Sequence, residues 1–104
     1  MPSSDVLLEK ILEQSNRLHT LILKGELEEA GVVEEGRANL IKACFSSNPQ
    51  FDSPQKAAES IRKIMSGDQT AMAFGQRLYA EMERERVQLQ KGKKAVSAYH
   101  EASG

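Results

Sequence analysis

The sequence predicts an all-α fold, an antiparallel helical hairpin followed by a long third helix in a three- to four-helix bundle. Its prolines fall at positions 2, 49 and 54, so residues 5–48 and 55–104 contain none. Ala, Leu, Glu, Lys, Gln and Arg dominate and β-branched residues are sparse, which favours helix along most of the chain. At 104 residues, we expect one domain spanning residues 1–104.

The first two helices are expected over about residues 5–24 and 26–45, joined at Gly25. Glycine suits the left-handed conformation that follows a helix, and the glutamates after Gly25 are favoured in the first turn of the next helix. Similar lengths and a very short link predict antiparallel neighbours. Apolar residues cover about 200° of the first helix, more than one neighbouring helix can bury. Packing against two helices or a dimer seam would explain this, so a homodimer is an alternative.

The third helix is expected over about residues 54–91, with Asp52 or Ser53 as its N-cap and Pro54 as its first residue. A tail or a short helix is expected over residues 92–104. The apolar residues between Ile61 and Leu89 keep one helical phase across Ser66 and Gly67. This predicts one long helix, whose far half extends beyond the shorter hairpin and is exposed.

Two charged residues fall within apolar stripes of the predicted helices. Arg37 lies in the inward face of the second helix and Asp68 in that of the third. A buried charge needs a partner, so we hypothesise that Arg37 and Asp68 pair, or that each pairs with another opposite charge. The alternative is that Arg37 extends its guanidinium into solvent. Cys44 lies in an apolar stripe and is expected to be a buried thiol without catalytic function.

Composition narrows the classes of function. The net charge is −1, with 14 basic and 15 acidic residues, which argues against nonspecific nucleic-acid binding. No apolar run approaches the ~20 residues of a membrane span, the N-terminus lacks the features of a secretory signal, and a single cysteine fits a reducing compartment, so we expect a cytoplasmic protein.

No motif indicates catalysis. His19 and His100 lack the spacing of metal ligands and there is no phosphate-binding loop, so we expect no metal, no cofactor and no enzymatic activity. A histidine phosphotransfer-like domain is an alternative based on His19 with Lys24. The five-residue spacing between them, however, puts the two side chains on different helix faces.

A partner-binding surface is expected on the exposed half of the third helix. Leu78, Met82 and Leu89 are candidates for a groove that receives an amphipathic segment. Phe74 lies on the other side of this helix, as a partner contact or as a residue buried against the N-terminal arm. Tyr99, an aromatic residue at the end of a basic tail, is better explained by docking than by packing. The basic residues of segment 84–94 form a solvated face or a docking site for an acidic partner.

Three segments of this chain resemble flagellar export chaperones of the FliT type: Glu34–Ile41 with Arg37, Ile61-x-x-Ile64-x-x-x-Asp68, and Gly92–Tyr99 with its Lys, Ala and Tyr. The resemblance implies a cytoplasmic chaperone that binds the C-terminal segment of the filament-cap protein (FliD), prevents its premature assembly and contacts the export ATPase machinery. An alternative is a helical adaptor or regulator that binds the export ATPase complex or a flagellar transcription factor.

Overall fold

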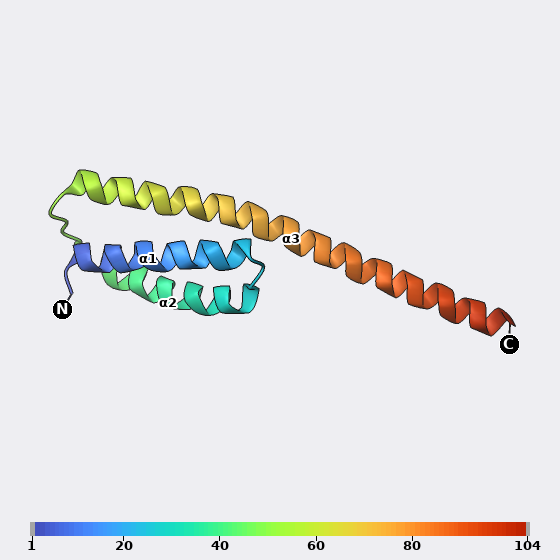
Figure 1. Cartoon of the computed structure of the whole chain (residues 1–104). Coiled ribbons are helices and arrows are strands. Elements are labelled where there is room, and N and C mark those ends of the chain that lie inside the picture. The colour runs from blue at the N-terminus through green and yellow to red at the C-terminus, as the bar shows by residue number, and fades with distance from the viewer. Residues whose placement is uncertain (1, 104) are drawn as a thin grey trace.

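Three α-helices make up most of the computed structural model, in which the backbone is described for residues 2–103. Side chains are described for the same residues except 97 and 99–103. The helices are α1 (Ser4–Leu23), α2 (Leu27–Phe45) and α3 (Pro54–Ser103). Residues 2–103 contain no strand. α1 and α2 form an antiparallel hairpin, and α3 runs beside α1 in the same direction (Figure 1). The predicted all-α fold is confirmed.

The ends of the helices follow from local chemistry. Ser3 caps α1, because its Oγ accepts a hydrogen bond from the backbone N–H of Val6 at 3.2 Å. Gly25 has φ of 76°, the left-handed conformation that its position after α1 predicts. Ser53 caps α3 by accepting a hydrogen bond from the Lys56 N–H at 3.3 Å. Of the two predicted caps of the third helix, Ser53 is therefore the one used.

The loop between α2 and α3 is tied to the start of α1. The Ser4 hydroxyl accepts a hydrogen bond from the N–H of Gln50 at 3.0 Å, and the Asp5 carboxylate accepts one from the N–H of Asp52 at 3.0 Å. These bonds satisfy backbone N–H groups in a loop that has no regular secondary structure to pair them. They hold the first turn of α3 beside the first turn of α1.

The apolar core surrounds α1, which packs against both α2 and α3. Packing against two helices, the first of the two predicted alternatives, explains the wide apolar arc of α1. Ile11 is the most buried large side chain of the core at 2% exposure. Cys44 is also buried, as predicted. The pKa of its thiol is raised, mainly by burial and to a smaller extent by the negative charge of Asp5.

The end of the third helix differs from the prediction. A tail or a separate short helix was expected over residues 92–104, but α3 continues without interruption to Ser103. Between residues 92 and 103, Gly92 is the one residue that opposes helix, and a single glycine costs only about 1 kcal/mol. Its neighbours are mostly good helix formers and include no proline. The predicted continuity through Ser66 and Gly67 is confirmed.

The second half of α3 extends beyond the hairpin, so the molecule measures 76 × 23 × 19 Å (Figure 1). Near the turn of the hairpin, Gly75 lies beside Ile22 and Leu78 lies beside Gly25. Beyond Leu78, all described side chains are exposed except that of Glu83, which is half-buried. We call residues 79–103 the α3 arm.

Candidate protein-binding site

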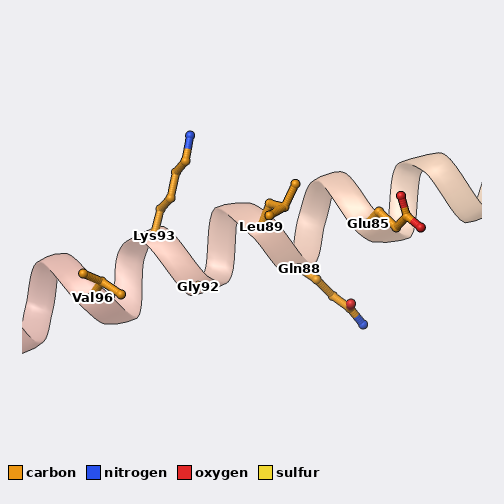
Figure 2. Close-up of a pocket in the computed structure, with 6 residues that line it drawn as sticks. All are labelled: Glu85, Gln88, Leu89, Gly92, Lys93 and Val96. Carbon is orange, nitrogen blue, oxygen red and sulfur yellow. The ribbon is translucent and has the colours of Figure 1, made fainter.

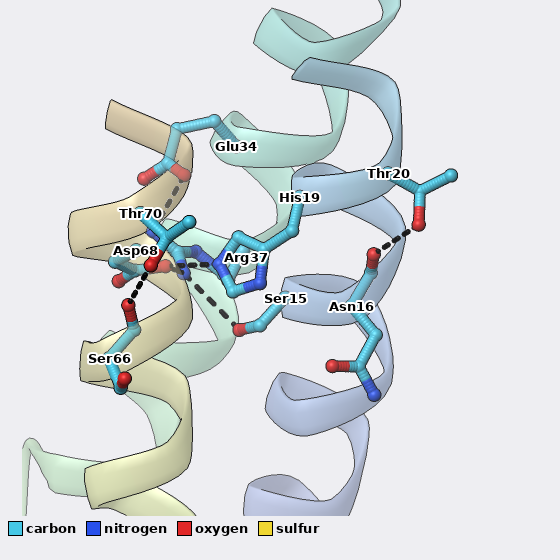
Figure 3. Close-up of polar contacts among 9 residues, drawn as sticks. All are labelled: Ser15, Asn16, His19, Thr20, Glu34, Arg37, Ser66, Asp68 and Thr70. Atoms are coloured by element: carbon cyan, nitrogen blue, oxygen red, sulfur yellow. Dashed lines mark hydrogen bonds and ion pairs between the residues drawn. The ribbon is translucent and has the colours of Figure 1, made fainter. Parts of the chain in front are cut away.

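A polar cluster between the three helices fixes the position of α3 (Figure 3). Arg37 of α2 donates hydrogen bonds from Nη1 to Oδ1 of Asp68 at 2.7 Å and to Oγ of Ser15 at 3.2 Å. Its Nη2 pairs with Glu34 at 2.8 Å. Nε2 of His19 lies 2.6 Å from the same Asp68 oxygen. The hypothesised Arg37–Asp68 pair is confirmed, and the guanidinium does not extend into solvent.

Asp68 is a carboxylate held by two partners from different helices. Burial alone would raise its pKa, but the hydrogen bonds from His19 and Arg37, together with their charges, outweigh burial and lower the pKa of Asp68. The side chain of Arg37 is 9% exposed, and its Nε is buried without a hydrogen-bond partner in the structure. One carboxylate oxygen of Asp68 thus contacts both α1 and α2, so this cluster links α3 to both helices of the hairpin.

The same contacts argue against phosphoryl transfer to His19. Its side chain is only 16% exposed, and its Nε2 already contacts the Asp68 carboxylate. A phosphoryl group there would place further negative charge beside an anion. The described residues also contain no group of three or more His, Cys, Asp or Glu side chains that could hold a metal ion.

The face of α3 that packs on α1 continues into the arm. Along the hairpin, two lines of this face recur every seven residues, which keeps them on nearly one side of the helix. One line is Ala57, Ile64 and Ala71, all buried, ending at the half-buried Leu78; the other is Ile61, Asp68 and Gly75.

Beyond the hairpin, the second line continues as Met82, Leu89 and Val96, at the same interval of seven residues. These side chains are 53%, 67% and 56% exposed. We call these three residues the arm stripe. It is the core-facing side of α3 at a point where the described part of the chain supplies nothing to cover it.

The arm stripe borders a shallow depression on the surface of α3. The depression is lined by Glu85, Gln88, Leu89, Gly92, Lys93 and Val96, all from one helix (Figure 2). Figure 2 shows Leu89 and Lys93 on the same side of the ribbon and Gln88 on the other. A site formed by one helix face is open along its length, and an elongated partner such as another helix fits it better than a small molecule.

The predicted partner-binding residues occupy different environments. Met82 and Leu89 lie together on the arm stripe, whereas Leu78 is half-buried beside Gly25. Phe74 is half-buried and lines a small depression with Leu78. Tyr99 belongs to α3, but its side chain lies outside the described residues. The binding function of all five residues stays a prediction.

Val96 was missed in the sequence analysis. The signal that could have identified it is the interval of seven residues, which places Val96 after Met82 and Leu89. The expected tail over residues 92–104 removed this residue from the third helix, and so hid the third member of the stripe. Its 56% exposure shows that the stripe extends far from the hairpin.

A second apolar surface lies where the hairpin turn meets α3. Met72 and Tyr79 are 62% and 63% exposed there. They line a largely apolar open groove with Ile22, Leu27, Ala71, Gly75 and Gln76. This surface lies to one side of the arm stripe, since Met72 and Tyr79 belong to a different seven-residue line. We call it the turn groove.

Fold and surface together define a class: a small all-helical protein whose exposed apolar faces suit contact with other proteins. No helix in the described part of the chain has the length and apolar character to cross a membrane. A family model described as flagellar protein FliT matches residues 6–101. The chain belongs to this family of flagellar proteins. Comparison with curated protein sequences and with solved structures gave no significant match.

Proposed function

We propose that this protein is a cytoplasmic chaperone of flagellar type III export that binds the C-terminal segment of the filament-cap protein (FliD) and prevents its premature assembly. Membership of the FliT family supports a flagellar role. The observation that carries the binding mechanism is the arm stripe, a core-like helix face without a covering element in the described chain. The protein acts by binding and has no catalytic step.

The mechanism is capture of an amphipathic helix along α3. A client segment that self-associates through an apolar face is kept apart when that face packs on Met82, Leu89 and Val96 instead. An unfolded client must become ordered on binding, which offsets part of the contact energy. Affinity is therefore moderate, as release of the client for export requires. Phe74, Leu78 and Tyr99 would extend the contact at either end of the stripe.

Calorimetric titration with the C-terminal segment of the filament-cap protein from the same genome tests this function. The informative variant is Met82→Asp/Leu89→Asp, because both side chains are exposed and neither supports the hairpin. Full burial of one such side chain contributes about 1.5–3 kcal/mol, so losing both should weaken binding by well over tenfold.

The matched control is Ala80→Asp/Val87→Asp. It places two aspartates seven residues apart on the same helix, in a different surface depression that lies away from the stripe. The control should bind as the unmodified protein does. Equal loss in both variants would show that the stripe is not the site, and absence of binding to the folded protein would contradict the chaperone function.

An adaptor or regulator that binds the export ATPase complex or a flagellar transcription factor is the second candidate. The turn groove favours it, because this surface is built from both the hairpin and α3 and so presents a folded shape. Met72→Asp should impair such an adaptor and leave capture of the filament-cap segment intact. A homodimer using either surface would appear as twice the monomer mass in light scattering.

A further inference from the structure

Charged residues of opposite sign border the two sides of the arm stripe. At about 100° per residue, Arg86 and Lys93 lie on one side of the line through Leu89, and Glu81 and Glu85 lie on the other. Lys93 and Glu85 line the same depression as Leu89 and Val96, so both charges are close to the apolar contact (Figure 2). The stripe thus has a basic edge and an acidic edge.

The basic edge has charge available for a partner. Arg86 is 3.1 Å from Glu83 through an exposed i, i+3 pair, which contributes little and can be exchanged. No acidic residue occurs between Arg86 and Glu101, and Lys93 in this stretch lines the depression beside Leu89 and Val96. The distal half of the stripe is therefore positive, and an occupant with acidic residues would complement it.

A second copy of this chain in parallel orientation would fit the stripe poorly. Between the apolar residues of the stripe, the positions that would face a parallel copy are Glu85 and Gly92. Two Glu85 carboxylates would then approach one another, and two Gly92 residues would leave a gap with no side chain to fill it. A different helix can place a polar or basic residue at Glu85 and a large apolar residue at Gly92.

We propose that the arm stripe binds an amphipathic helix of a partner protein that carries acidic residues along the edge facing Arg86 and Lys93 and a bulky apolar residue opposite Gly92. This proposal rests on the proposed function, since it defines the chemistry of the client segment. The apolar residues provide most of the contact, and the charged edges set the orientation and register of the bound helix.

Two synthetic helical peptides of about 18 residues test the proposal by fluorescence anisotropy, since about five turns span the stripe. They share one apolar face and differ only in one edge, which is glutamate in the first peptide and lysine in the second. The unmodified protein should bind the acidic-edged peptide at least about tenfold more tightly at low ionic strength, and the difference should shrink with salt.

Charge-reversal variants provide the matched comparison. Arg86→Glu/Lys93→Glu should reverse the preference between the peptides. Arg84→Glu/Lys91→Glu changes the net charge equally, on residues that line the depression away from the stripe, and should keep the preference. Equal effects of the two variants would show that net charge, and not the position of the charges, determines the preference, and would overturn the proposal. Equal binding of both peptides to the unmodified protein would also overturn it.

Parallel titrations with the filament-cap segment separate this proposal from the proposed function. If that segment binds and Arg86→Glu/Lys93→Glu has no effect, the charged-edge proposal fails and the function holds. If that segment does not bind but the acidic-edged peptide does, the function fails and the charged-edge proposal holds. Self-association of the free protein, lost in Arg86→Glu/Lys93→Glu, would assign the stripe to a second copy and overturn the proposal.

Discussion

Replacing Arg37 with methionine removes the charge that links α2 to α3. The substitution loses the hydrogen bonds to Asp68 at 2.7 Å and to Ser15 at 3.2 Å, and the pair with Glu34 at 2.8 Å. Hydrogen bonds to charged groups contribute about 1.5–3 kcal/mol each, and a buried hydroxyl without its partner costs about 1–3 kcal/mol.

Three features reduce the net effect of this substitution. His19 remains beside Asp68, whose side chain is 31% exposed, and Glu34 is half in solvent. Methionine also recovers apolar contact in the space of the arginine stem. We therefore expect Arg37→Met to lower the free energy of unfolding by about 2–3 kcal/mol, less than the full loss of a buried ion pair.

Urea unfolding followed by circular dichroism at 222 nm measures this change. A loss of about 2–3 kcal/mol in a chain of this size corresponds to a fall in Tm of about 8–20 °C. The control is Lys42→Met, which removes an exposed cation from the same helix and should change stability by less than about 0.5 kcal/mol. Unchanged stability in Arg37→Met would refute the structural importance assigned to the cluster.

Two further perturbations test the same cluster. Gly67→Ala should destabilise the fold by about 1–3 kcal/mol, since the new Cβ would overlap the His19 ring. Gly36→Ala, where a Cβ would meet open space, should stabilise the fold by about 0.5–1 kcal/mol. Thermal unfolding of both variants checks this, and equal responses would contradict the packing of His19 on Gly67. For Asp68, the lowered folded-state pKa means that its carboxylate stabilises the fold at pH values above its ordinary pKa of about 3.9. The stability difference between the unmodified protein and Asp68→Asn should therefore be complete at neutral pH and decrease as the pH falls through 3.9 toward the lowered pKa; a difference that does not depend on pH would contradict this.

Much of the fold could be predicted because the relevant signals are local. Proline placement, Gly25 and the cap before Pro54 determine where helices begin and end, and these are properties of a few neighbouring residues. The Arg37–Asp68 pair could also be predicted from the sequence, because each charge interrupts an apolar face and a buried charge requires a partner.

The rest of the cluster depended on tertiary contact. Ser15 is a polar interruption in the apolar face of α1 and is fully buried, and nothing in α1 itself indicates that its partner is Arg37 of α2. His19 was considered for phosphoryl transfer, because nothing in its own helix indicates that it meets Asp68 49 positions later. The rotation of α1 against α3, together with the missing side chain of Gly67, brings these residues together.

The extent of the binding surface was underestimated for a different reason. Gly92 resembles a helix end, but the residues after it favour helix again, so the predicted end at residue 91 is too early. The arm stripe is defined by a seven-residue interval that begins in the buried part of α3, and its significance depends on where the hairpin ends. That point, near Leu78, is set by the lengths of α1 and α2 in space.

Amide hydrogen exchange with and without the filament-cap segment tests the central claim most directly, because it locates the bound client on α3. The described side chains of residues 80–96 are exposed, apart from the half-buried Glu83, so the amides of this stretch should exchange rapidly in the free protein through local opening. Binding of the client should slow exchange across residues 79–96 and leave α2 unchanged. Protection confined to the hairpin or to the turn groove, with the arm still exchanging rapidly, would contradict capture of the client by the arm stripe.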